Sequence, residues 1–120
     1  MTRPLGQISF MTRETVNTIC GQLPAATLDH DLGPAHDSWK IGGKLFAVIG
    51  SQSGGVSVKT DGIETAQMLI DAGLAVKAPY FHRSWVNVPL DADPAELSHR
   101  IGVSYDIIRS SLPKKVQAAL

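Results

Sequence analysis

The chain has 120 residues, of which 43% are hydrophobic and 18% charged, and this composition excludes a disordered chain and a fibrous polymer. Lys plus Arg number 11, as do Asp plus Glu, so the formal net charge is zero and binding by bulk positive charge, as in a histone, is excluded. No apolar run approaches the roughly 18 residues that span a bilayer, and the single cysteine excludes an internal disulfide. We therefore expect a soluble cytoplasmic protein with one hydrophobic core and no membrane partner.

The first helix is predicted directly after a short extension. We expect residues 1–10 to be a loosely ordered extension and residues 11–120 to form a single domain. Thr12 is a good N-cap, and Pro24 ends the helical pattern. Apolar residues recur on one helical face at Val16, Ile19, Cys20 and Leu23. Because Cys20 lies on this apolar stripe, we expect it to be a buried, unreactive thiol.

A change from the helical period to a period of two marks a predicted antiparallel meander. A turn-rich stretch over residues 25–37 precedes it. Gly42 and Gly43 supply the positive φ angles of a tight hairpin turn, and a looser turn follows over residues 51–55. The three predicted strands are residues 39–41, 44–49 and 56–59. Consecutive strands with such short connections pair antiparallel.

A second helix, more extended chain and a third helix complete the pattern. The second helix covers residues 63–72, and residues 76–90 return to extended structure. Asp93 then caps a third helix that starts with a proline and runs to Pro113, with Gly102 weakening its middle. The apolar positions of this helix are Leu97, Ile101, Tyr105, Ile108 and Leu112.

This order of elements predicts an α+β fold with two layers: an antiparallel sheet of about five strands with helices on one face. The other face of such a sheet can remain in water, and its side chains then decide what the protein binds. We expect the core to include Val16, Ile19, Leu23, Phe46, Val48, Val58, Leu69, Trp85, Val86, Ile101, Tyr105 and Ile108.

Motifs for catalysis are missing from the sequence, which has no nucleophile elbow, no phosphate-binding glycine loop, no HExxH pair and no cysteine pair. One loop has side chains of the types that bind divalent cations, namely Asp29, His30, Asp31, His36 and Asp37. A solvated loop that caps its own backbone through Asx turns is the simpler interpretation. We therefore predict no enzyme activity, no cofactor and no metal, with this loop as the alternative that would revise the prediction.

Positive charge is concentrated in the predicted strands although the net charge is zero. Nine of the eleven acids fall within residues 29–37, 61–71 and 91–96, which are connections and helix starts. A basic sheet that also carries aromatic rings can neutralise phosphates and stack on bases. Acids at helix starts and lysines on edge strands are, however, also ordinary features of folding.

Eight short segments occur along the chain: Met11-Thr-Arg-Glu14, Leu23-Pro-Ala-Ala-Thr27, Trp39-Lys-Ile-Gly-Gly-Lys-Leu-Phe-Ala47, Val58-Lys59, Ala78-Pro-Tyr80, Trp85-Val86, Ser104-Tyr105 and Leu112-Pro-Lys-Lys115. Their order and sequence resemble the MmcQ/YjbR family over roughly residues 11–115, and the run from Lys40 to Ala47 is the most specific. The resemblance implies a fold similar to that of CyaY and frataxin, with the order αβββαββα. The family is described as DNA-binding through a sheet of the double-wing type. Frataxin-like iron binding is not implied, because residues 12–22 hold one acid, Glu14, against one base, Arg13.

The resulting hypothesis is weak, phosphate-directed DNA binding without catalysis. The predicted phosphate contacts are Lys40, Lys44, Lys59, Lys77 and Arg83, supported by Lys114 and Lys115. The predicted surface aromatics are Trp39, Tyr80 and Phe81. Pairing of the cations with Asp29, Asp31 or Asp37 would remove the positive face and favour the alternative, a small chaperone-like adaptor that binds another protein through the exposed sheet face or edge. The oligomeric state stays open, with a monomer favoured.

Overall fold

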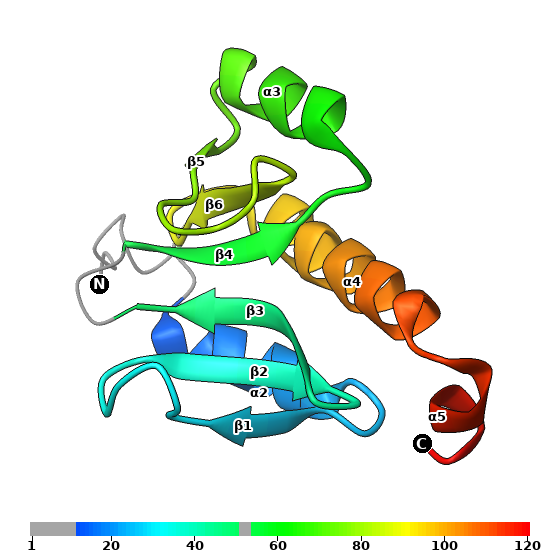
Figure 1. The fold of residues 1–120 in the computed structure, drawn as a ribbon. Helices are drawn as coiled ribbons and strands as arrows, with labels where there is room; N and C mark the ends of the chain where they lie inside the picture. The colour runs from blue at the N-terminus through cyan, green and yellow to red at the C-terminus, as the bar shows by residue number, and fades with distance from the viewer. Residues whose placement is uncertain (1–11, 51–53) are drawn as a thin grey trace.

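A six-stranded antiparallel sheet forms the centre of the fold (Figure 1). The computed structural model describes residues 12–50 and 54–120, so the extension predicted over residues 1–10 lies outside the described residues. The described elements are α2 (Arg13–Gln22), β1 (Thr27–Asp29), β2 (Asp37–Ile41), β3 (Lys44–Ile49), β4 (Gly55–Lys59), α3 (Ile63–Asp71), β5 (Val76–Lys77), β6 (Trp85–Pro89), α4 (Pro94–Ser111) and α5 (Lys114–Ala118).

The strands lie in the order β1-β2-β3-β4-β6-β5, and each neighbouring pair is antiparallel. The predicted meander is therefore confirmed as β2, β3 and β4, with Gly42 and Gly43 at φ angles of 58° and 84° in its first turn. The prediction of about five strands missed β1. Its three residues, within the stretch predicted to be turns, are too few to show a period of two.

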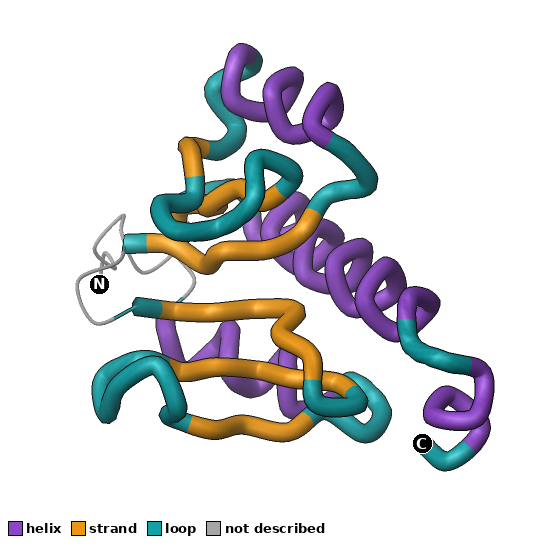
Figure 2. Tube along the Cα trace, in the orientation of Figure 1, coloured by secondary structure: helices purple, strands orange, loops and turns teal. Residues whose placement is uncertain are grey.

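Helices α2 and α4 cover one face of the sheet, as predicted, and lie behind it in Figure 2. Helix α4 packs on β3 and β4, whereas α3 packs at the edge formed by β6 and β5. We call the face that carries α2 and α4 the helical face and the other the open face. Among the described residues, no helix covers the middle of the open face.

The predicted helix caps are confirmed by their hydrogen bonds. The amide of Thr15 donates to Thr12 Oγ1 at 3.1 Å at the start of α2. The amide of Ala95 donates to Asp93 Oδ1 at 2.9 Å, with Pro94 as the first residue of α4. Helix α4 then continues without a break through Gly102, because 18 residues packed on the sheet outweigh the roughly 1 kcal/mol that one glycine costs.

A bulge in β3 changes which side chains face the helices. Trp39 pairs with Ala47 and Lys40 pairs with Leu45, so β3 holds one extra residue, Phe46, opposite this step. Phe46 and Ala47 consequently both join the core on the helical face. The neighbours Leu45 and Val48 line the open face instead. Val48 is buried as predicted, but on the opposite side of the sheet from the core.

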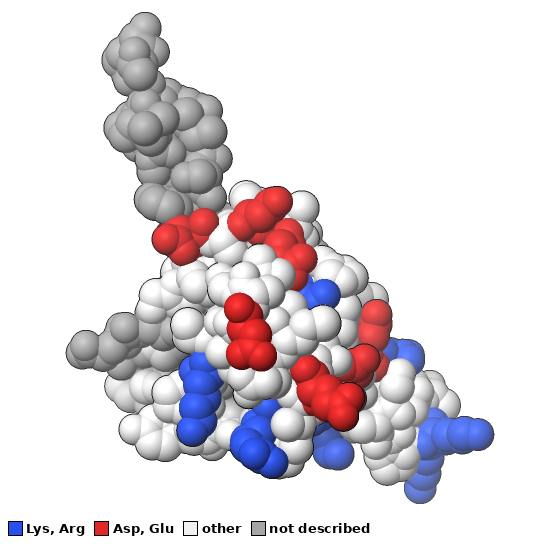
Figure 3. All heavy atoms as spheres, turned by 90° about the horizontal axis from the view of Figure 1, so that it is seen from above, with Lys and Arg blue, Asp and Glu red and all other residues white. Residues whose placement is uncertain are grey.

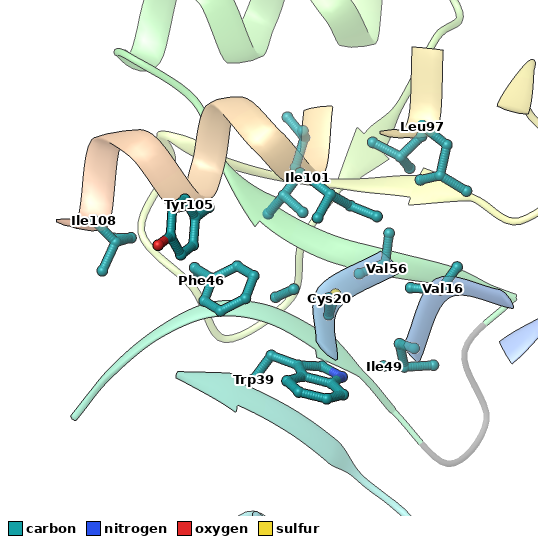
Figure 4. Packing of buried hydrophobic residues seen from close by; sticks show 14 of the residues in the cluster. Val16, Cys20, Trp39, Phe46, Ile49, Val56, Leu97, Ile101, Tyr105 and Ile108 are labelled. Carbon is teal, nitrogen blue, oxygen red and sulfur yellow. The ribbon is translucent and has the colours of Figure 1, made fainter. Parts of the chain in front are cut away.

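The core lies between the helical face and helices α2 and α4 (Figure 4). Phe46 is fully buried and meets Tyr105 edge to face, with ring centroids 5.4 Å apart. Cys20 is also fully buried, as predicted, and burial raises the pKa of its thiol to about 12. The predicted core residues that are buried in this cluster are Val16, Phe46, Val58, Leu69, Val86, Ile101, Tyr105 and Ile108, with Ile19 and Leu23 half-buried against it. Trp85 was wrongly placed in the core, because it is only half-buried and stacks on Phe81 outside the core cluster.

Candidate binding face of the sheet

An open groove of about 860 Å³ crosses the open face. The loop between β1 and β2 contributes one wall, and the segment that follows β5 contributes the other. The floor comes from β3, β4 and β6. The lining residues are mostly apolar: Leu32, His36, Leu45, Val48, Gly50, Ser57, Val76, Lys77, Pro79, Tyr80, Phe81 and Asn87. We call this hollow the open-face groove. Its volume falls within the range of 300 to 1,000 Å³ that ligand sites typically have.

Two aromatic residues form part of the wall after β5. Phe81 stacks on Trp85 with ring centroids 4.7 Å apart and planes at 23°. Tyr80 is entirely exposed, and its backbone is left-handed with φ of 71°. Both predicted surface aromatics of this segment therefore line the open-face groove. The strand pattern missed Trp85 as the stacking partner of Phe81 because strand aromatics usually belong to a core.

Trp39 was wrongly predicted as a surface aromatic. Its side chain is 7% exposed, and its Nε1 donates to Asn17 Oδ1 at 2.8 Å. The indole thus lies under α2, where a polar side chain of that helix satisfies its single donor. The period of two could not tell on which face Trp39 lies.

A second hollow, of about 310 Å³, adjoins the open-face groove. The two hollows share Lys77 and Phe81 in their walls, and the second is completed by α3 and by the residues before β6. Its remaining lining residues are Ile63, Gln67, Ile70, Ala78, His82, Arg83 and Trp85. Among the described residues that line either hollow, none is Asp or Glu.

Sheet register brings most of the predicted phosphate contacts to one end of the sheet. Strand β3 begins at Lys44, β4 ends at Lys59, and β5 ends at Lys77. Because these strands alternate in direction, the three residues share the end at which β6 begins, two residues after Arg83. We use the name cationic end for these four residues and two more, namely Lys44, Lys59, Lys77, Arg83, Lys114 and Lys115.

Helix α5 belongs to the same end. A Cβ atom at Gly42 would lie 2.5 Å from Leu112 Cδ1 and 3.3 Å from Val116 Cγ1, so the β2–β3 turn packs directly against the start and middle of the C-terminal segment. Lys114 and Lys115 therefore lie next to the turn that precedes Lys44. Seen from above, most Lys and Arg side chains in view lie along the lower and right-hand margin of the molecule, and most acids in view lie above them (Figure 3).

Lys59 is held by a hydrogen-bond network that the sequence did not reveal. Its Nζ donates to Ser84 Oγ at 2.7 Å, and that oxygen lies 2.8 Å from His82 Nδ1. The amide of Ser84 also donates to His82 Nδ1 at 3.1 Å, which closes a local turn. Ser84 is buried, so the network fixes the segment before β6 and does not present a serine nucleophile. Only the His-x-Ser spacing could have signalled it.

Lys40 does not contribute a free positive charge to the open face. Its Nζ lies 2.8 Å from Asp29 Oδ2 and 3.0 Å from Asp31 Oδ2. The hydrogen bond with Lys40 holds the pKa of Asp29 below its ordinary value, and the same bond raises the pKa of Lys40. The inclusion of Lys40 among unpaired cations was therefore wrong. Among the described residues, Lys44, Lys59, Lys77 and Arg83 form no ion pair with a carboxylate.

The remaining acid of this loop, Asp37, accepts hydrogen bonds from two side chains of α2. Arg13 Nε donates to Asp37 Oδ2 at 2.7 Å, and Asn17 Nδ2 donates to the same oxygen at 2.9 Å. Burial opposes the charge of Asp37, but these hydrogen bonds outweigh it and lower its pKa. His30 Nδ1 lies 2.9 Å from the carbonyl oxygen of His36 and 3.6 Å from Asp37 Oδ1.

The loop is thus organised by its own ion pairs and hydrogen bonds. Within residues 12–50 and 54–120, no three His, Cys, Asp or Glu side chains are arranged to hold a metal ion. The helices of these ranges include none with the length and apolar character of a membrane span.

Comparisons with known proteins bear on the fold. The family model described as YjbR matches residues 21–107. Among solved structures, the chain is similar to the crystal structure of Deinococcus radiodurans protein DR2400, which has a domain of the family model DUF419. The TM-score is 0.80 at 20% sequence identity, and the match covers 92% of this chain and 88% of that one. A search of curated proteins gave no match.

Proposed function

This chain belongs to the YjbR family, which is not a known enzyme family, and we propose that it is a non-catalytic DNA-binding protein that holds phosphates weakly and without sequence preference. The observation that carries the proposal is the cationic end. Lys44, Lys59, Lys77 and Arg83 lie at one end of the sheet and have no carboxylate partner among the described residues. A neutral protein can therefore present local positive potential to a polyanion.

The chemistry of these side chains sets the expected mode of binding. Lysines contact phosphates as point charges and distinguish bases poorly, whereas Arg83 can form bidentate contacts. Lys59 already donates to Ser84, so only part of its ammonium is available to a ligand. A handful of such contacts supports weak, salt-sensitive affinity that depends little on sequence.

A second candidate function, a protein-interaction adaptor, rests on the apolar lining of the open-face groove. Leu32, Val76 and Tyr80 line it and are exposed by 50%, 54% and 105%. Strand β5 is an edge of the described sheet and pairs only with β6, and an edge of this kind is where a partner can add a strand. An apolar segment of another protein could use both features.

The dependence of binding affinity on salt concentration distinguishes the two functions. We would titrate fluorescently labelled DNA with the protein at about 50 mM and about 200 mM salt and follow anisotropy. Phosphate binding predicts a steep loss of affinity with salt, since each phosphate contact contributes about 0.9 to the slope of log K against log salt. No detectable binding at the lower salt would contradict the proposal and favour the adaptor.

A charge-removal variant locates the contacts. Three exposed residues of the cationic end are changed together in Lys44→Gln, Lys77→Gln and Arg83→Gln. Lys59 is kept because it supports the segment before β6. We expect the salt slope to fall by about three units. The matched control is Arg100→Gln, which removes a cation paired with Glu96 on α4 and should leave the slope unchanged.

A further inference from the structure

Tyr80 has a conformation that folding does not explain. Its side chain is wholly exposed, and its φ of 71° is a left-handed value that bulky residues rarely adopt. A residue held in such a conformation costs stability, and residues of this kind concentrate at functional sites. The ring buries nothing in the free protein, yet it stands at the wall of the open-face groove.

The surroundings of Tyr80 combine flat aromatic surface with positive charge. Phe81, the next residue, stacks on Trp85 and lines both hollows. Lys77 also lines both hollows, and Arg83 lines the second. Since no acid of the described chain lines either one, an occupant must match an apolar floor, exposed rings and cations at the same time.

We infer that the open-face groove receives the bases of single-stranded DNA, with Tyr80 as the stacking platform and with Lys77 and Arg83 on the adjoining phosphates. Single-stranded nucleic acids are held in this way elsewhere, by aromatic rings beside a positively charged track. A duplex keeps its bases stacked inside, so it can use the cations but not the groove. The inference rests on the proposed function and adds to it a preference for single strands.

Charge complementarity favours this occupant over an apolar peptide. A peptide would fill the groove but would leave Lys77 and Arg83 without a partner unless it were acidic. A single strand supplies an anion for every base that it offers, in a repeating spacing that suits two contiguous hollows. The groove volume of about 860 Å³ is large enough for more than one planar group.

The test compares a labelled oligo-dT of about 15 nucleotides with a duplex of the same length, using anisotropy at low salt. Three variants probe the ring: Tyr80→Phe keeps it, Tyr80→Leu keeps apolar bulk, and Tyr80→Ala removes both. Because Tyr80 is fully exposed, none of these should disturb folding, and circular dichroism checks this.

We expect tighter binding of the single strand than of the duplex. Tyr80→Ala and Tyr80→Leu should weaken single-strand binding about 5- to 150-fold while leaving duplex binding unchanged, and Tyr80→Phe should behave as the unaltered protein. The pair Lys77→Gln and Arg83→Gln should weaken both.

Other outcomes overturn the inference in distinguishable ways. Equal binding of both DNAs, with silent Tyr80 variants, removes the single-strand preference but leaves the proposed function intact. Absence of binding to either DNA removes both. Displacement of the oligo-dT by an uncharged apolar peptide, with no dependence on salt, would assign the groove to a protein partner instead.

Discussion

The two sides of the open face differ in whether their cations are paired with carboxylates. On the β1–β2 side, Lys40 is paired with Asp29 and Asp31. On the β6–β5 side, Lys77 and Arg83 line hollows to which no described acid contributes. Along the sequence the two groups look alike, since each is a basic residue in or next to a strand.

The difference shows that a basic residue in the sequence does not always give an unpaired positive charge on the surface. The acids that neutralise Lys40 come from β1 and from the loop after it, and they reach Lys40 because β1 pairs with β2. Among the described strands, none with acids lies beside β5, which is the opposite edge of the sheet. Strand order therefore decides which cations remain available to a ligand.

The largest expected effect is a loss of folding stability when β3, the strand between the two sides, loses its contact with α4. Strand β3 lies in the middle of the sheet, and Phe46 anchors it to Tyr105 on α4. Phe46→Ala should lower the free energy of unfolding by about 3 to 5 kcal/mol, whereas Leu45→Ala, on the open face, should cost about 1 kcal/mol. Urea denaturation of both variants measures this. Similar losses would mean that the open face is packed as firmly as the core.

Asp37→Asn should break the ion pairing between α2 and the start of β2. The variant loses the charge-assisted bonds from Arg13 and Asn17, which should cost about 1 to 3 kcal/mol of unfolding free energy at neutral pH. Because the folded-state pKa of Asp37 is lowered, its stabilising effect is present above the unfolded value of about 3.9 and is lost as the pH falls through the folded value. Denaturation curves of both proteins should therefore converge in acid. A constant gap at all pH values would contradict the ion-pair explanation.

Removing the carboxylates that pair with Lys40 should leave an unpaired cation on the β1–β2 side, as on the β6–β5 side. In the double variant Asp29→Asn and Asp31→Asn, each side chain keeps an oxygen acceptor, so the bond from the Asp31 amide can persist. The freed ammonium should add about one unit to the salt slope of DNA binding. An unchanged slope would show that DNA does not approach this side of the groove.

The smallest effect is expected when Lys40 itself is removed. Lys40→Gln should leave the salt slope as it is, because the ammonium is already neutralised, while Lys77→Gln should lower the slope by about one unit. The two variants carry the same charge change on the same sheet. Equal slopes for both would remove the distinction between the two sides.

The sequence predicted the parts of the fold that depend on local chemistry. The Gly42-Gly43 turn, the caps at Thr12 and Asp93 and the helical stripe with Cys20 each follow from a few adjacent residues. The parts that failed depend on partners far along the chain. Trp39 is covered by α2, and Lys40 is neutralised from a strand that the pattern did not show.

The sequence predicted some residues of the candidate site but not the groove that they line. Tyr80 and Phe81 were named from their position next to a strand, and both line the groove. The groove itself could not be predicted, because its walls come from two loops that meet only across the assembled sheet. The hydrogen bond between Lys59 and Ser84 also joins residues 25 positions apart.

The bulge in β3 has a consequence for changes in chain length. Leu45 and Val48 face the groove, and the two residues between them both face the core, so this strand already contains one position that alternation does not need. Deleting Ala47 would restore strict alternation and leave every other side chain of β3 on its present face. A relative shorter by one residue at this point would therefore keep both the core and the groove. Most single deletions elsewhere in a strand exchange the two faces beyond them.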